Sequence, residues 1–328
     1  MKITTSEIEF EDSFYTLFPN TKISCFRYGN EEQVYHVHYF LPLYNKHLKG
    51  SDYFYDEIKN YSHFTSIESI KGIITSRSIR LYNLNNLKDP REYTYAGGIL
   101  NKDPKRLKDS LDNLFNLSLI KLDKNEKGFM SKKFNMWRLY GKDGKGCLIN
   151  FEFSITPPLD WHEFYFAPIK YGIEKKINIS RLKRYLDNIN RSSEKIGIDL
   201  DPLPCFHKSG LYRMEKEFRL LYDGREIKGY KPRNITQNGI KIFPNIFVEP
   251  RNRSTKLIKY LDLPIFKSAF QNIDESIPIL KINSITLGYQ FKNNFDRKRS
   301  ELESLANQNL GYVPEITRSL LSKTYWGK

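Results

Sequence analysis

The chain has 328 residues, a formal net charge of +15, and 39% hydrophobic and 14% aromatic residues. This apolar content suffices for a sizeable core and excludes an intrinsically disordered chain. No apolar run is long enough for a membrane helix, the first residues lack the layout of a signal peptide, and three widely spaced cysteines indicate no disulfide framework. We therefore expect a soluble, cytoplasmic protein with no membrane partner.

Residues 1–55 are expected to form an N-terminal extension packed on the core. Residues 33–39 alternate between polar and apolar types, which is typical of a half-buried strand. Such a strand would place His36 and His38 on one face. Because no third ligand is near, a polar strand face is a simpler interpretation than a metal site.

Residues 61–84 predict a strand, a helix and a strand. Tyr61 to Thr65 form the first strand and residues 79–84 the second. Ser66 is a typical helix N-cap, and it precedes an apolar stripe made of Ile67, Ile70, Ile73 and Ile74. A polar loop, 85–91, is expected to follow.

A further helix is predicted over residues 103–117, where Asp103 can cap the start and leucines share one face. Residues 134–140 form a short aromatic segment. The glycine-rich stretch 141–146 contains Asp-Gly, which predicts a tight hairpin turn before a strand over 147–153.

The second half is rich in strands, expected at 217–222, 239–248 and 284–290. Residues 173–204 are interpreted as an insertion that contains a basic helix from Ser180. A charged helix near 297–307 and an extended segment over 315–325 end the chain. Helices and strands in this order predict an α+β fold.

The residues Glu215, Glu217 and Arg219 would share one face if their segment is a strand. A carboxylate near a ribose can stabilise the positive charge that develops when an N-glycosidic bond breaks, so Glu215 and Glu217 are candidate catalytic residues. The simpler alternative is an exposed strand face with an Arg–Glu pair.

Three other clusters contain candidate ligand-binding side chains. At the strand-to-helix junction, His63 could hydrogen-bond a ribose, and Thr65 could cap the helix or bind a phosphate. Asp89 and Glu92 lie in a polar loop, for which an ordinary Asp-Pro turn is the alternative. The rings of Trp137 and Tyr140 could stack on nicotinamide or a base, although core packing is the default for Trp137.

The order of these motifs resembles a widespread bacterial domain family that is distantly related to DarT-type ADP-ribosyltransferases. The resemblance covers residues 56–328 and departs from the family at Lys88, where Asn is usual. The motifs that carry it are His63-Phe64-Thr65, Asp89-Pro90-x-Glu92, Met136-Trp137-x-x-Tyr140-Gly141 and Glu215-x-Glu217-Phe218-Arg219.

The resemblance implies an ADP-ribosyltransferase-like domain with a split β-sandwich core and flanking helices, which binds NAD⁺ as co-substrate. It implies that His63 holds a ribose hydroxyl and that Trp137 or Tyr140 packs near the nicotinamide. It further implies that Glu217 stabilises the ribosyl cation and that Glu215 positions the acceptor. Thr65, Asp89 and Glu92 complete the expected cofactor contacts. Such an enzyme would fit a toxin or a phage-defence effector, with an antitoxin or regulatory protein as a further partner.

The acceptor is expected to be a macromolecule, and the positive charge favours RNA or DNA. A Lys-rich composition explains the charge equally well, because no compact block of Lys and Arg stands out. Surplus charge is expected near the mouth of the cleft, partly through residues 181–191. Two other functions stay open: a non-catalytic nucleic-acid-binding module, and a metal-dependent nuclease that uses Asp89, Glu92, Glu215 and Glu217.

Overall fold

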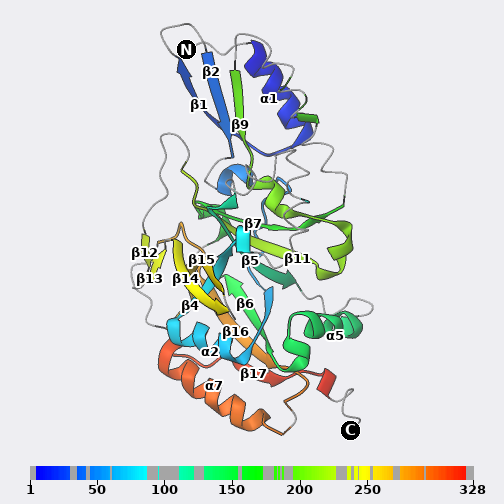
Figure 1. Cartoon of the computed structure of the whole chain (residues 1–328), viewed down its shortest axis with the longest axis vertical. Helices are drawn as coiled ribbons and strands as arrows, with labels where there is room; N and C mark the ends of the chain where they lie inside the picture. Colours follow the sequence, from blue (N-terminus) through cyan, green and yellow to red (C-terminus); the bar gives the residue numbers. More distant parts are fainter. Residues whose placement is uncertain are drawn as a thin grey trace.

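A large mixed β-sheet forms the middle of the molecule, and helices cover parts of it (Figure 1). The computed structural model describes residues 5–29, 35–41, 45–59, 61–86, 95, 111–121, 129–153, 157–172, 181, 182, 184, 187, 195–226, 235–237, 240–242, 244–251, 254–268, 274–291 and 293–322. Its described α-helices are α1 (Thr5–Leu17), α2 (Ile67–Ser76), α5 (Phe129–Leu139) and α7 (Phe295–Leu310). Short 3₁₀ helices are η1 (Asn45–Leu48), η2 (Leu84–Asn86), η3 (Lys142–Gly144), η4 (Pro158–Asp160), η5 (Leu203–Phe206) and η6 (Gly210–Glu215).

The described strands fall into one large sheet and three small ones. Those of the large sheet are β3 (Tyr61–Thr65), β4 (Ser78–Asn83), β5 (Leu114–Lys121), β6 (Cys147–Phe153), β7 (Phe164–Pro168), β11 (Glu217–Asp223), β14 (Pro244–Arg251), β15 (Ser254–Pro264), β16 (Leu280–Leu287) and β17 (Glu315–Arg318). Those of the small sheets are β1 (Ser24–Gly29), β2 (Tyr35–Phe40) and β9 (Lys195–Asp199); β8 (Lys170–Tyr171) and β10 (His207–Lys208); and β12 (Ile235–Gln237) and β13 (Ile240–Ile242).

The large sheet has the order β14-β15-β4-β5-β3-β6-β16-β17, with β11 and then β7 attached beside β5. Its described neighbours pair antiparallel, except that β17 runs parallel to β16. The arrangement is a mixed α+β fold, so the expected class is confirmed at that level. A doubly wound parallel sheet would have required mostly parallel neighbours.

The sheet forks at β5. Strand β11 follows one edge of β5 from Leu114 to Ile120. The opposite edge is shared, because β4 pairs with its beginning at Phe115 and Asn116 whereas β3 pairs with its end at Ile120 and Lys121. Strands β3 and β4 therefore diverge from each other along β5, and helix α2 connects them.

The strand–helix–strand prediction for residues 61–84 is confirmed, because β3, α2 and β4 occupy these positions. Ser66 caps α2 as expected, since its hydroxyl accepts a hydrogen bond from the Ser69 backbone N–H at 3.0 Å. Ile70 and Ile74 are fully buried and belong to the same core cluster as Leu302 and Ala306 of α7.

The helix predicted over 103–117 is wrong from Leu114 onward, where β5 begins; residues 103–110 lie outside the described part of the chain. Most of β5 is buried because the strand lies between neighbours in the interior of the sheet. Such a strand has apolar residues on both faces, and a short apolar run of this kind resembles a buried helix.

Two smaller predictions are also corrected. The aromatic segment 134–140 belongs almost entirely to α5, a helix rather than an isolated segment. The Asp-Gly turn connects this helix to β6 and is not a hairpin. Asp143 and Gly144 adopt left-handed φ values of 54° and 80°, which let the chain reverse within η3.

The N-terminal residues form a layer of their own at one end of the molecule (Figure 1). Here β2 pairs antiparallel with β1 and parallel with β9, which comes from the region interpreted as an insertion. Phe10 and Phe14 of α1 share a buried cluster with Tyr165 of β7 and Leu221 of β11. The first residues of the chain thus bury apolar surface against the central sheet.

Candidate active site

A solvent-open pocket lies where β3 separates from β5, and its cavity volume is about 160 Å³. Four of the predicted site residues, His63, Tyr140, Glu215 and Glu217, line it. The other lining residues are Phe64, Ser118, Ile120, Met136 and Lys208. Side chains far apart in the sequence therefore meet at one place.

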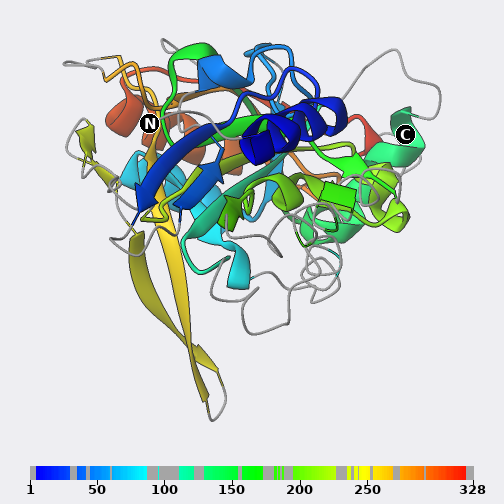
Figure 2. The same ribbon diagram turned by 90° about the horizontal axis from the view of Figure 1, so that it is seen from above.

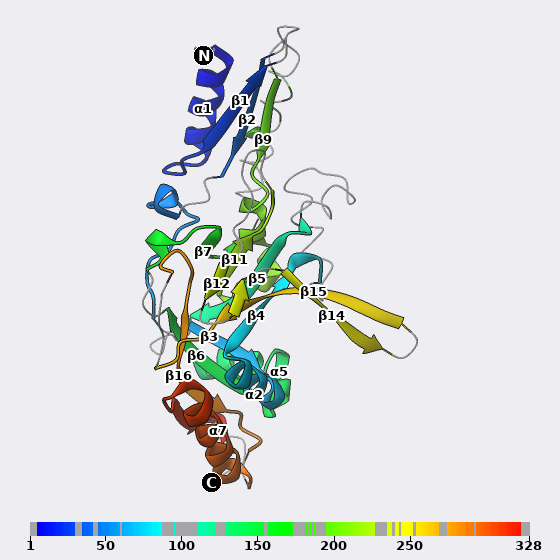
Figure 3. The ribbon, with the colours of Figure 1, turned by 90° about the vertical axis from the view of Figure 1, so that its left-hand side faces the viewer.

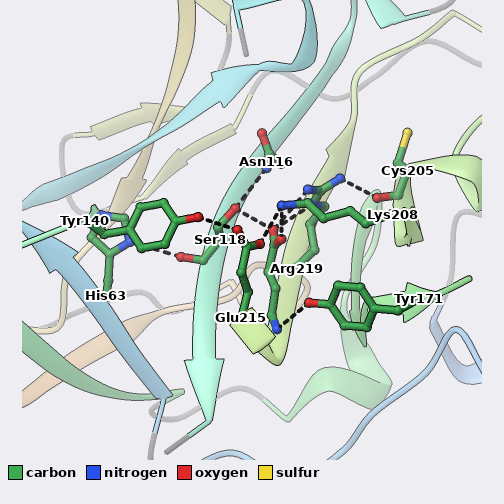
Figure 4. Close-up of polar contacts among 10 residues, drawn as sticks. His63, Asn116, Ser118, Tyr140, Tyr171, Cys205, Lys208, Glu215 and Arg219 are labelled. Carbon is green, nitrogen blue, oxygen red and sulfur yellow. Dashed lines mark hydrogen bonds and ion pairs between the residues drawn. The ribbon is translucent and has the colours of Figure 1, made fainter. Parts of the chain in front are cut away.

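Glu217 is the first residue of β11, and its carboxylate is surrounded by polar groups of Ser118, Lys208 and Arg219, which are labelled in Figure 4. The Ser118 hydroxyl donates to Oε1 at 2.5 Å, and Arg219 donates to the same oxygen through Nε at 3.1 Å and Nη2 at 3.0 Å. Lys208 Nζ lies 2.6 Å from Oε2. The main chain is also fixed, because the Glu217 N–H donates to the Tyr171 hydroxyl at 2.9 Å.

The carboxylate of Glu217 is buried and ionised. Burial alone would raise the pKa of Glu217, but the charges of Arg219 and Lys208 outweigh burial and hold the pKa below its usual value. The Glu217 and Arg219 side chains are each 3% exposed. An exposed strand face with a solvated Arg–Glu pair, the simpler alternative considered from the sequence, does not describe this site.

Glu215 reaches the same pocket from a different backbone conformation than expected. It ends the 3₁₀ helix η6, and Lys216 adopts a left-handed φ of 48° before the strand begins. The prediction that Glu215 lies on the strand is therefore wrong. Tyr140 donates its hydroxyl hydrogen to Glu215 Oε1, and Lys208 Nζ lies 3.0 Å from Oε2. Lys208 thus bridges the two carboxylates.

His63 lies at the fork of the sheet, immediately after the last β3–β5 residue pair, Ser62 with Ile120. Its Nδ1–H donates to the Ser118 carbonyl at 3.0 Å. Burial lowers the pKa of His63, so the ring is neutral at pH 7. A neutral ring that donates through Nδ1 has Nε2 as a hydrogen-bond acceptor, which suits contact with a hydroxyl group.

A second pocket adjoins the first one at His63, which lines both. It has a cavity volume of about 610 Å³ and extends between α2 and strand β4. Thr65, Ser69, Arg80 and Asp262 are among its lining residues. Thr65 therefore lies in the second pocket and not beside Glu217.

Of the remaining predicted residues, Trp137 does not line the pocket. Trp137 is fully buried and packs edge-on against Phe64, with ring centroids 5.0 Å apart. Trp137 therefore packs in the core and does not offer its ring for stacking on nicotinamide or a base. Asp89 and Glu92 lie outside the described residues, so their predicted contacts stay predictions.

Sequence reasoning did not identify Lys208 and Ser118 as site residues. Lys208 follows the buried segment Leu203–Phe206, and its side chain is only 5% exposed. A lysine directly after an apolar segment is a weak signal, because many lysines project into solvent from such positions. Ser118 interrupts the apolar pattern of β5, which was interpreted as the end of a helix.

Replacing Lys208 with Met is expected to move the acid limb of the pH–activity profile to higher pH. The substitution removes one of the two cations that lower the pKa of Glu217, so this carboxylate gains a proton at a higher pH than in the native protein. Catalytic turnover measured across pH tests the expectation. Lys170→Met is a matched control, because Lys170 lies opposite His207 on β8 and pairs with Asp52 instead. An unchanged acid limb in Lys208→Met would contradict this account of Glu217.

No protein-family model, curated protein or solved structure gives a significant match to this chain. Among the described residues, no group of three or more His, Cys, Asp and Glu side chains is arranged to hold a metal ion. None of the described helices is both long and apolar enough to cross a membrane.

Proposed function

We propose that this chain is an ADP-ribosyltransferase that moves ADP-ribose from NAD⁺ to a nucleic acid. The observation that supports the proposal most is the buried, ionised carboxylate of Glu217 on the wall of a pocket that also contains His63 and Tyr140. The order of sequence motifs, which resembles that of DarT-type enzymes, agrees with this assignment.

In this reaction the bond between nicotinamide N1 and ribose C1′ breaks, and the electron pair leaves with neutral nicotinamide. Positive charge develops on the ribose, and the fixed carboxylate of Glu217 stabilises it. An acceptor nucleophile then forms a bond to C1′ and loses a proton, for which Glu215 is the nearby base. The His63 Nε2 acceptor holds a ribose hydroxyl in position.

NAD⁺ has two nucleoside halves, and two adjoining pockets that share His63 can hold them. The pocket with Glu217 would take the nicotinamide riboside. The pocket beside α2 would take the adenosine half, with Thr65 and Arg80 near the pyrophosphate. We extend the proposal to a split β-sandwich core, with the fork at β5 as the point where the sheet would divide.

The decisive experiment incubates the purified protein with NAD⁺ labelled in its adenylate moiety and separate pools of RNA, DNA and protein. Label in RNA or DNA is the expected result. Label in protein alone would support the transferase activity but would show that the acceptor is a protein and not a nucleic acid. NAD⁺ that is neither bound nor consumed would favour the non-catalytic binding module. Nucleic acid cleavage that stops in chelator would favour the metal-dependent nuclease.

Replacing Glu215 with Gln is expected to impair transfer more than NAD⁺ hydrolysis. Glu215 lies at the pocket beside Glu217, and its carboxylate is the group available to accept the proton of an acceptor nucleophile. Water can still attack C1′ when this base is absent. Nicotinamide release and label incorporation, measured in parallel, separate the two reactions, and equal losses in both would contradict the assigned role.

The biological setting is part of the same proposal. A cytoplasmic enzyme that modifies nucleic acid would act as a toxin or in phage defence, and an antitoxin or regulatory protein would be its expected partner.

A further inference from the structure

A long hairpin projects from the body of the molecule (Figures 2 and 3). It consists of β14 and β15, which pair from Pro244 with Leu261 to Arg251 with Ser254. Strand β14 ends the order of the large sheet, so it is paired only through β15 in the described strand order. The hairpin therefore extends the sheet beyond the packed core.

The sequence of this region is strongly basic. Residues 228–260 contain eight Lys and Arg residues and one acid, Glu249, a net charge of +7 within a total of +15. The basic residues are spread along this stretch of the sequence, so no compact block marks them. Of these residues, the described strands contain Lys241, Arg251, Lys256 and Lys259. The segment 181–191, where surplus charge was expected, has only Arg181 and Arg184 as described basic residues.

The hairpin is continuous with the candidate active site. Asp262 of β15 pairs with Arg80 of β4, and both residues line the second pocket. Strand β15 rises by about 3.3 Å per residue, so Ser254 lies about 26 Å along the strand from Asp262. A molecule that binds along the hairpin is therefore guided to the edge of the pocket.

We infer that the β14–β15 hairpin is an arm that binds the nucleic acid acceptor, an inference that rests on the proposed transferase function. A two-stranded ribbon fits the major groove of a duplex, and its cations can also contact the backbone of a single strand. The net charge of +7 over residues 228–260, to which the described strands of the hairpin contribute Arg251, Lys256 and Lys259, supplies the attraction for phosphate. The arm brings the acceptor to the fork, where the reactive ribose carbon is held.

The test measures binding of the full-length protein, without NAD⁺, to three labelled probes: single-stranded DNA, the corresponding RNA and duplex DNA, each of 20 nucleotides or base pairs (about two duplex turns). The hairpin variant R251Q/K256Q/K259Q removes three cations from β14 and β15. The control R297Q/K298Q/R299Q removes three cations from α7. If each lost cation contacted a phosphate, the slope of log K against log salt becomes shallower by about 2–3, and affinity at moderate salt falls at least about tenfold.

The control variant is expected to bind as the native protein does, and the probe bound most tightly identifies the form of nucleic acid. Native affinity in the hairpin variant, an equal loss in the control, or no binding of any probe by the native protein would overturn the inference. NAD⁺ hydrolysis is measured on the same samples. If native protein binds nucleic acid through the hairpin but never consumes NAD⁺, the proposed function fails while the binding arm stands. If the native protein hydrolyses NAD⁺ and the hairpin variant still binds nucleic acid as tightly as the native protein does, the proposed function stands and only the inference about the hairpin fails.

Discussion

Replacing Glu217 with Gln is expected to lower ADP-ribosyl transfer by about 10²–10³-fold, the usual effect of losing one well-placed electrostatic group. Gln has nearly the same size and keeps an acceptor oxygen, so the ground-state contacts with NAD⁺ largely persist. The lost negative charge matters most when the ribose becomes cationic, so the effect falls on the chemical step. Label incorporation under single-turnover conditions, together with NAD⁺ affinity by calorimetry, separates chemistry from binding.

The buried position of Glu217 requires a control for stability. Gln leaves the Arg219 and Lys208 cations facing a neutral group, and breaking a buried ion pair is commonly destabilising. Glu7→Gln is a matched control, because Glu7 is fully buried on α1 and pairs with Arg27 at 2.7 Å. Both variants should lose stability, but only Glu217→Gln should lose activity. Normal transfer by a folded Glu217→Gln protein would contradict the catalytic role proposed for Glu217.

Replacing Trp137 with Ala is expected to reduce the free energy of unfolding by about 3–5 kcal/mol, because a large buried ring leaves a cavity that the surroundings fill incompletely. The packing is close here: a Cβ added at Gly141 would lie 2.4 Å from the Trp137 ring. Urea-induced unfolding followed by circular dichroism measures the change.

The same helix offers a control for Trp137. Leu139 is 70% exposed, so Leu139→Ala should alter stability little. The interpretation of Trp137 as a nicotinamide platform makes the opposite prediction: near-native stability with a raised KM for NAD⁺. That result would contradict the core role assigned here.

Local sequence patterns predicted those strands and helices that have a clear apolar pattern or a typical capping residue. The strands over 61–65 and 147–153 were predicted to the residue, and Ser66 caps α2 as expected. A capping hydroxyl before an apolar stripe indicates the start of a helix, because the hydroxyl can accept a hydrogen bond from a free N–H group of the first turn. Helix α7 was likewise expected, although it begins two residues earlier and ends three later.

Elements defined by tertiary contacts were not predictable in the same way. The first half of β5, residues 114–117, was interpreted as the end of a helix, because its neighbours in the sheet, and not its own pattern, make it a strand. The role of Lys208 depends on an ion pair between β10 and β11, two strands that lie in different sheets. Glu215 was placed near Glu217 correctly, but the left-handed turn at Lys216 was not expected, because Lys rarely adopts that conformation.

The pairing of β2 with β9 has a consequence for synthesis of the chain. The partner of β2 is made roughly 155 residues later, which takes about 8–30 s at ribosomal rates of about 5–20 residues per second. During that interval β2 has an open strand edge, and the apolar side of α1 lacks the surface that covers it in the finished protein. Glu217 emerges later still, so a nascent chain has no assembled pocket until the start of β11 has been made. The proposed transferase would thus lack the Glu217 carboxylate until about two-thirds of its chain has been made.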